Sequence, residues 1–172
     1  MSQSRTFRFG ILTGGAASRK AWVDKAKQAE SLGYSTLLID DHLYNPFAPL
    51  TALVSAADAT TSLRVGSLVF GNDFRHPVVL AKEAATLDVL TDGRFELGLG
   101  TGYSREDYEQ SGMTFQSPRT RVSRFEEAVQ IIKGLFTDDA VTYAGNYYTI
   151  NNLNGLPKPI QKPHPQIGRA HV

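Results

Sequence analysis

The chain of 172 residues is long enough for one domain with a buried core, and its 41% hydrophobic and 20% charged residues are ordinary for a globular protein. A formal net charge of +1 gives no argument for a nucleic-acid or membrane partner, and the absence of cysteine excludes disulfides, thiolate catalysis and cysteine-bound metals. The first residues lack the apolar core of a signal peptide, so we expect a cytoplasmic protein.

Strand and helix signals alternate along most of the chain. Apolar runs predict strands at residues 7–12, 35–39, 63–70 and 95–99, and a fifth strand that begins at residue 166. Apolar residues at helical spacing predict helices that begin near Ser18, Pro49 and Pro77, and a longer helix over residues 119–136. Such strict alternation is typical of a parallel sheet.

The expected strand–helix units are each about 30 residues long, whereas a complete eight-unit barrel needs roughly 250 residues. The pattern therefore predicts either a small doubly wound domain or half of a barrel. Beyond the fourth helix, residues 141–144 and 147–150 flank Gly145-Asn146, which predicts a hairpin with a two-residue turn. A proline-rich linker over residues 156–165 leads to the fifth strand.

The stretch TDGRFELGLGTGY, residues 91–103, ends a buried strand with glycines at alternate positions, Gly98, Gly100 and Gly102. Glycine allows the backbone to approach a ligand or a neighbouring strand closely. The dinucleotide fingerprint is not completed, because its third glycine would fall at Tyr103. On this stretch alone, tight strand packing is favoured over a ligand site.

Polar side chains follow three of the expected strands, at the edge where parallel sheets bind ligands. They are Asp40, Asp41 and His42 after the second, Asn72, Asp73, Arg75 and His76 after the third, and Thr101, Tyr103, Arg105 and Glu106 after the fourth. An imidazole exchanges protons near neutral pH, which makes His42 a catalytic candidate. For an isolated Asp-His pair, however, a solvated loop position without a catalytic role is favoured. GxSxG and HExxH are absent, so we expect neither a nucleophile elbow nor a metal.

In order and spacing, these features resemble the luciferase-like monooxygenase family, which includes flavin- and deazaflavin-dependent oxidoreductases. The matching stretches are RFGIL, LLIDDHLYNPFAPLTAL, LRVGSLVFGNDFRHPVVLAKEAATLDVLTDGRFELGLGTGY, RFEEAVQIIKGLF, VTYAGNYYTI and LPKPIQKPHPQIG. They cover nearly the whole chain. GNDFRHP and DDHLYNPF are most similar to the branch that uses coenzyme F420.

The resemblance implies an α/β fold of the (β/α)₈ TIM-barrel type. Residues 1–167 would be the N-terminal half of one barrel domain, with about four βα units and a hairpin. Residues 168–172 depart from the family's pattern, so we expect a truncation or a foreign tail. We also expect an exposed edge on the fourth strand and weak or no cofactor binding by this chain alone, because barrels commonly hold phosphate in loops after the seventh and eighth strands.

The resemblance also implies site residues. His42 would be catalytic, and Asp41 would lie beside the reactive ring of F420 or, alternatively, FMN. Leu68 and Val69 would lie under the ring, joined by a non-proline cis peptide bond. Thr101, Gly102 and Glu106 would approach the ring or its side chain. The family's sugar-phosphate dehydrogenases carry a glutamate where this chain has Tyr103, which argues against that substrate.

We expect an oxidoreductase that acts on a small organic substrate. It would either transfer a hydride to or from the substrate or oxygenate it. The full-length protein would be a homo-oligomer without a nucleic-acid or membrane partner. One alternative is a methyltransferase, because FELGLGTGY resembles the glycine-rich motif of enzymes that use S-adenosylmethionine, although that motif normally ends the first strand of its sheet. The other alternative is an inactive structural fragment.

Overall fold

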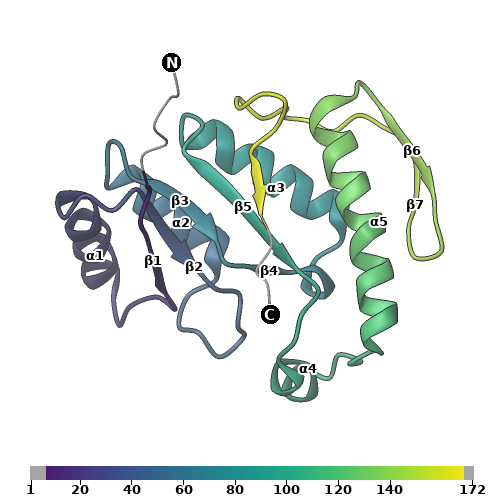
Figure 1. The fold of residues 1–172 in the computed structure, drawn as a ribbon, viewed down its shortest axis with the longest axis horizontal. Coiled ribbons are helices and arrows are strands. Elements are labelled where there is room, and N and C mark those ends of the chain that lie inside the picture. Colours follow the sequence, from purple (N-terminus) through teal and green to yellow (C-terminus); the bar gives the residue numbers. More distant parts are fainter. Residues whose placement is uncertain (1–6, 169–172) are drawn as a thin grey trace.

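The strands form an all-parallel sheet beside a separate antiparallel hairpin (Figure 1). A computed structural model of the chain describes residues 7–168. Along the sheet the strands follow the order β1, β2, β3, β5, β8, and the short β4 continues the line of β3 beside β5. Their bounds are β1 Gly10–Thr13, β2 Thr36–Ile39, β3 Arg64–Ser67, β4 Phe70–Gly71, β5 Phe95–Gly100 and β8 Gln166–Gly168, and the hairpin is β6 Val141–Ala144 and β7 Thr149–Leu153.

The helices that connect the strands pack successively against one another, α1 on α2, α2 on α3 and α3 on α5. Their bounds are α1 Arg19–Ser31, α2 Pro49–Asp58, α3 Pro77–Leu90 and α5 Pro118–Thr137, with a 3₁₀ turn at Asn72–Phe74 and a short α4 at Arg105–Ser111. The Ser18 hydroxyl accepts a hydrogen bond from the Ala21 amide at 3.2 Å and caps α1. Proline, which tolerates the first helical turn because it needs no amide donor there, begins α2, α3 and α5.

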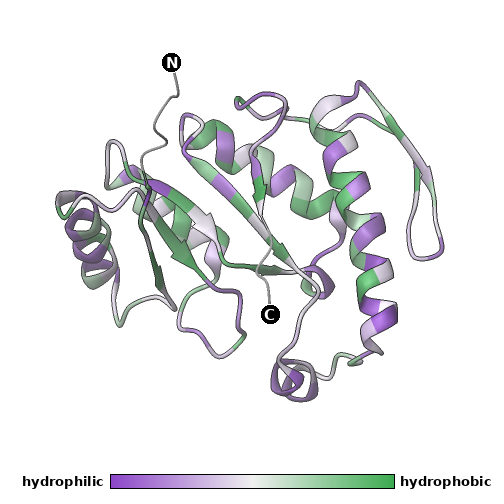
Figure 2. Ribbon diagram, in the orientation of Figure 1, coloured by the Kyte–Doolittle hydropathy of each residue, from purple (hydrophilic) through white to green (hydrophobic). Residues whose placement is uncertain are grey.

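The core lies between the sheet and the inner faces of these helices. Figure 2 shows β2 largely green, β5 with green, white and purple segments, and α5 with alternating green and purple turns, as expected for a helix that buries one face. Burial of a leucine or phenylalanine side chain stabilises the fold by about 1.5–3 kcal/mol. The fully buried large side chains include Trp22, Leu37, Ile39, Leu53, Leu63, Leu80, Phe95 and Leu97.

The strand order follows the chain order without reversal, and this distinguishes a partial (β/α)₈ barrel from a doubly wound domain. The expectation of an exposed edge on the fourth strand was wrong. Glu96, Leu97 and Gly98 of β5 pair with the three residues of β8, so the linker brings the chain back to cover that edge. In the described part of the chain, the outer strands of the sheet are β1 and β8.

Three local features differ from the sequence-based expectation. The third strand is interrupted at residues 68–69, which separates β3 from β4. The hairpin turn spans residues 145–148 instead of two residues, because Glu127 of α5 accepts hydrogen bonds from the amides of Asn146, Tyr147 and Tyr148 at 2.8, 3.0 and 3.2 Å. The expected loop after β5 contains α4. Of the proposed atypical tail, residues 169–172 lie outside the described residues.

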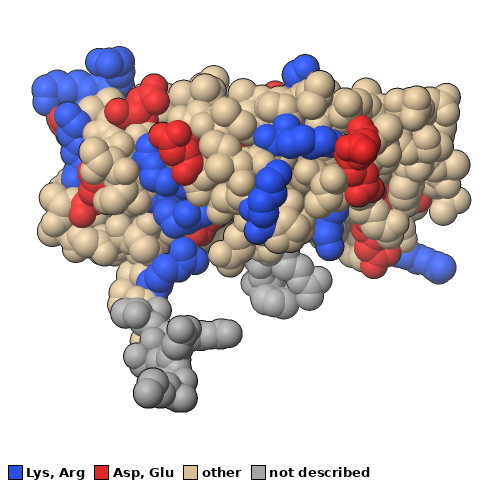
Figure 3. Space-filling model, turned by 90° about the horizontal axis from the view of Figure 1, so that it is seen from above, with Lys and Arg blue, Asp and Glu red and all other residues tan. Residues whose placement is uncertain are grey.

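The face seen in Figure 3 carries interspersed positive and negative side chains. This agrees with the small net charge of the sequence. No helix within residues 7–168 is both long and apolar enough to cross a membrane.

Candidate active site

A cavity of about 470 Å³ lies at the C-terminal ends of the strands. Its volume falls in the range of small-molecule sites, about 300–1,000 Å³. Its walls combine apolar side chains with a few polar groups from loops that are far apart in the sequence. The lining residues are Leu12, Asp40, Asp41, His42, Leu68, Val69, Gly71, Phe74, Gly100, Thr101, Gly102, Tyr103, Ser104, Asp107 and Tyr108.

His42 follows β2 and has hydrogen-bond partners at both ring nitrogens. Its Nδ1 lies 2.7 Å from Oδ2 of Asp107, and its Nε2 lies 2.9 Å from the hydroxyl of Tyr103. The ring of Tyr44 stacks on the imidazole with a centroid distance of 4.9 Å and an interplanar angle of 11°. Oδ2 of Asp40 lies 4.0 Å from Nε2. The imidazole is therefore oriented by groups from two separate loops.

Asp107 is the buried partner of this histidine. Burial raises the pKa of the Asp107 carboxyl, but the hydrogen bond with His42 and a 3.0 Å hydrogen bond from the Leu43 amide outweigh burial, and the net pKa is lowered from 3.8. A carboxylate that is ionised at neutral pH can only accept hydrogen bonds. The neutral imidazole is therefore assigned the tautomer with its proton on Nδ1, which leaves Nε2 as an acceptor.

Asp41 lines the same cavity, but its carboxylate is already engaged. The Arg75 guanidinium donates to both oxygens, with Nη2 2.9 Å from Oδ1, and the Gly71 amide donates to Oδ2 at 3.0 Å. Arg75 also lies over the ring of Phe70, 5.0 Å from its centroid. The structure thus gives Asp41 a clear role in holding the loop after β4 against the end of β2.

The glycines that end β5 are explained by close packing and by backbone conformation. A Cβ added to Gly98 would collide with the Ser67 carbonyl oxygen, and one added to Gly100 would lie 2.6 Å from Cγ2 of Val69. Gly102 has φ +77, and a Cβ there would collide with the Tyr108 hydroxyl. The tight-packing interpretation therefore holds for Gly98, whereas Gly100 and Gly102 also line the cavity.

Leu68 and Val69 lie in the interruption between β3 and β4 and line the cavity. The peptide bond between them is cis, which confirms the expectation drawn from the family resemblance. Leu68 is 37% exposed although it follows a buried strand. Leu68 and Val69 thus form an apolar part of the cavity wall, between the polar groups of the loops that follow β2 and β5.

Arginines of α5 hold the segments after β4 and β5 in place. Nη1 of Arg121 donates to the Gly102 carbonyl oxygen at 2.6 Å, and Arg124 forms a 2.6 Å ion pair with Asp73. The Tyr108 hydroxyl donates to Asp73 at 2.9 Å. Burial and this hydrogen bond raise the pKa of Tyr108 to about 12, so its hydroxyl stays protonated at neutral pH. Tyr108 is therefore a fixed wall of the cavity.

The cavity brings together Asp41, His42, Leu68, Val69, Thr101 and Gly102, six of the seven site residues that the sequence indicated. Glu106 is not among the lining residues. Its side chain is exposed on α4 and accepts a 2.8 Å hydrogen bond from Gln110. Its neighbour Asp107 was not among the site residues that the sequence indicated. A pairing across 65 positions has no local signal, although Ser104 as the cap of α4 would have placed Asp107 within the first turn.

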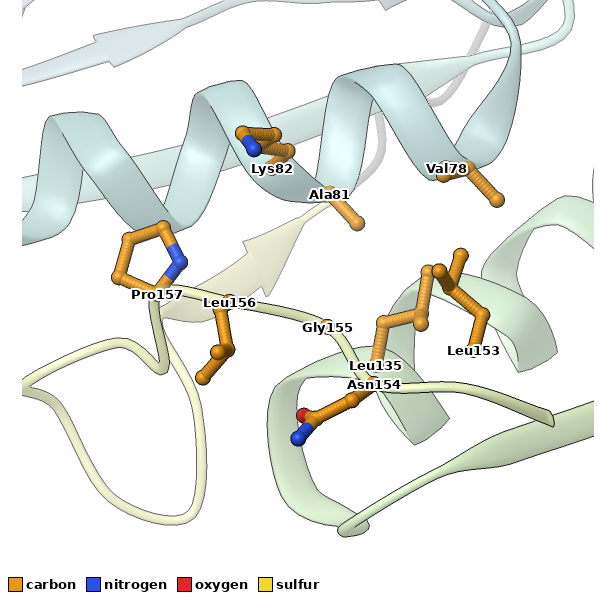
Figure 4. A pocket seen from close by; sticks show the side chains of 9 residues that line it. All are labelled: Val78, Ala81, Lys82, Leu135, Leu153, Asn154, Gly155, Leu156 and Pro157. Atoms are coloured by element: carbon orange, nitrogen blue, oxygen red, sulfur yellow. The ribbon is translucent and has the colours of Figure 1, made fainter.

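A second hollow lies between α3, α5 and the segment after β7 (Figure 4). Its volume is about 190 Å³, and its walls are mostly aliphatic, with Lys82 the ionisable residue among them. Within residues 7–168, no group of three or more His, Asp or Glu side chains is arranged to hold a metal ion. The proton-exchanging groups that the structure brings together are those around His42.

The profile of the luciferase-like monooxygenase family matches residues 4–170. The chain belongs to the luciferase-like monooxygenase family. A similar relative is the F420-dependent glucose-6-phosphate dehydrogenase of Kineococcus radiotolerans, 35% identical over 147 residues, which are 80% of this chain and 43% of the relative. Another is the FMNH(2)-dependent dimethylsulfone monooxygenase of Pseudomonas putida, 31% identical over 109 residues, 63% of this chain and 30% of the relative.

Among solved structures, this family member is similar to the monooxygenase RslO1 from Streptomyces bottropensis. The TM-score is 0.83 and the sequence identity 25%, with 95% of this chain and 53% of RslO1 covered. The chain spans about half the length of the relatives it matches first, 43% and 59% of them. The shared fold is thus a partial TIM barrel, in agreement with the fold class predicted from the sequence.

Proposed function

We propose that this chain provides a cofactor-binding part of an oxidoreductase that uses F420, with FMN as the alternative cofactor. The observation that carries the proposal is the His42–Asp107 pair at the edge of a cavity with an apolar floor. An oriented histidine beside an apolar floor suits a flat heteroaromatic ring whose reaction also requires proton exchange. Relatives named for F420 and for reduced FMN support the choice between these two cofactors.

The residues present fit such a ring. Leu68 and Val69 offer an apolar platform, and at Gly100 and Gly102 the backbone borders the cavity without a side chain. Thr101 adds a hydroxyl at the rim. When bound, the ring would supply hydride transfer and, as reduced flavin, oxygen activation.

The chain's own residues supply binding, orientation and proton handling. The Asp41–Arg75 pair and the Arg121 hydrogen bond to Gly102 fix the loops that border the cavity. Asp107 fixes the tautomer of His42, so that Nε2 is the ring nitrogen that can accept a proton and return it. The substrate we propose is a small organic molecule.

The methyltransferase alternative has less support. Its motif was assigned to the glycines after Phe95, yet Gly98 is required by contact with the Ser67 carbonyl, and Gly100 by contact with Val69. The motif ends β5, the fourth strand across the sheet, whereas in a methyltransferase it would end the first strand. The family match also favours the oxidoreductase.

The experiment is an NMR titration of the ¹⁵N-labelled chain with F420 and, separately, with FMN. We expect weak binding, because the chain covers about half of its relatives, with amide shifts concentrated at Val69, Thr101 and Gly102 and larger for F420. Gly100→Val, which fills the floor beside Val69, should abolish these shifts, whereas Gln28→Ala, at an exposed position on α1, should leave them unchanged. Shifts confined to other surfaces, or shifts in Gly100→Val equal to those of the wild type, would contradict the proposal.

A further inference from the structure

We propose that Tyr103, and not His42, is the residue that exchanges a proton with the substrate, with His42 as the proton acceptor behind it and Asp107 as a positioning residue. This inference deepens the proposed function and rests on it. It names the substrate class as an alcohol or carbonyl compound, whose oxygen atom gives up or receives the proton at the phenol.

The hydrogen bonds of His42 leave neither nitrogen free to face a substrate. Nδ1 is bound to Asp107 at 2.7 Å and Nε2 to the Tyr103 hydroxyl at 2.9 Å. The side chain of His42 is 13% exposed, whereas Tyr103 is 64% exposed and lines the cavity. A substrate that enters the cavity therefore meets the phenol before it meets the imidazole.

The direction of the hydrogen bonds follows from the charge of Asp107. The Leu43 amide and the His42 ring both donate to this carboxylate, whose lowered pKa keeps it ionised at neutral pH. With its proton on Nδ1, His42 accepts the Tyr103 proton at Nε2. Oδ2 of Asp40 lies 4.0 Å from the same Nε2.

The proton transfer is balanced without a change of oxidation state. The O–H bond of a substrate hydroxyl breaks, its electron pair stays on the substrate oxygen, and a new O–H bond forms at the Tyr103 oxygen. The original phenol proton moves to Nε2 of His42. The reverse transfer delivers a proton to the oxygen of a carbonyl substrate during its reduction.

Nitration by tetranitromethane tests the coupling, because this reagent reacts with the phenolate form of tyrosine. Tyr147 is the internal reference, because it is exposed on the hairpin turn, where its amide donates to Glu127 of α5. We expect His42→Gln to slow nitration of Tyr103 several-fold, measured by peptide mass spectrometry, and Asp107→Asn to slow it less. Nitration of Tyr147 should change little, and the surface variant Asp24→Asn should change neither rate.

The tautomer of His42 is a second readout that a purely structural role would not move. In ¹⁵N-histidine spectra, wild-type His42 should carry its proton on Nδ1, and Asp107→Asn should shift the equilibrium towards the Nε2 tautomer. Tyr103→Phe, at an exposed position that should not affect folding, should shift the Nε2 resonance and keep the tautomer.

An unchanged Tyr103 nitration rate in His42→Gln, or an unchanged Nε2 resonance in Tyr103→Phe, would overturn the inference. Neither readout needs a cofactor, so failure here is distinct from failure of the cofactor titration.

Discussion

Asp41 and Arg75 form a two-point ion pair that joins the end of β2 to the segment before α3, with Nη2 of Arg75 2.9 Å from Oδ1 of Asp41. The pair lies directly behind the cavity, and both side chains are largely buried. Removal of one partner of a buried ion pair leaves the other charge without compensation, which is far more costly than loss of an exposed pair.

Asp41→Asn should therefore lower the free energy of unfolding by about 3 kcal/mol, because it leaves the Arg75 guanidinium without its carboxylate. The matched control is Asp24→Asn, which removes an exposed 2.6 Å pair with Lys20 and should cost less than about 1 kcal/mol. Urea unfolding followed by circular dichroism measures both. Equal losses in the two variants would show that the Asp41 pair is no more important than a surface contact.

Gly102→Ala should destabilise the chain by about 3 kcal/mol, because its positive φ and the Tyr108 hydroxyl both oppose a side chain. Gly112→Ala separates the two causes. Gly112 has φ +74 but nothing within 4 Å of an added Cβ, so its cost of about 1–2 kcal/mol reports backbone conformation alone. Thermal and urea unfolding of the pair give the difference, and a Gly102 variant no less stable than the Gly112 variant would refute the contact with Tyr108.

Glu30 should stabilise the fold in a pH-dependent way. Hydrogen bonds from the Ser62 amide first, and also from the Leu63 and Thr61 amides, lower the pKa of Glu30 to about 2 from 4.5 and outweigh desolvation. Because the folded-state pKa is the lower one, this stabilisation is complete above about pH 4.5 and is lost as the pH falls towards 2.

Glu30→Gln should thus cost about 1 kcal/mol at pH 7, since solvent screens this partly exposed group, and much less at pH 3. Urea midpoints at the two pH values measure the change. Glu126→Gln, at an exposed position on α5, removes the same charge and should show little pH dependence of this kind. A loss of stability in Glu30→Gln that is larger at pH 3 than at pH 7 would contradict this prediction.

Glu127→Ala should loosen the hairpin more than the sheet, because the three turn amides it binds lose their acceptor. We expect a loss of about 2 kcal/mol, and faster amide hydrogen exchange confined to β6, β7 and their turn. The neighbouring Glu126→Ala provides the control. Uniformly faster exchange over β2, β3 and β5 would instead assign Glu127 to the global core.

Much of the fold could be predicted from the sequence because it depends on local signals. The buried runs that became β2, β3 and β5, and the prolines that begin α2, α3 and α5, act over a few residues. The covered edge of β5 could not be predicted in this way, since it depends on where the proline-rich linker returns the chain. The length of the hairpin turn likewise depends on Glu127, which is distant in sequence.

The candidate site likewise contains residues that could be predicted from the sequence and a residue that could not. Parallel sheets bind ligands at the C-terminal ends of their strands, and this rule and the family resemblance together placed His42, Asp41 and Val69 near one another. The structure brings all three to one cavity. Asp107 was missed because its partner is 65 positions away and its neighbour Glu106 has the same chemistry. Only the winding of α4 decides which of the two acids turns inward.

Both hydrogen-bonding partners of the His42 ring, Tyr103 and Asp107, belong to the short stretch between β5 and α5. Genetic exchange of residues 101–117 would replace both partners at once and leave every strand of the parallel sheet and its pairing untouched. In evolutionary terms, His42 is inherited with the sheet, and its two hydrogen-bonding partners are inherited with a separate short segment. Exchange of that segment can therefore change the surroundings of His42 without a change of fold.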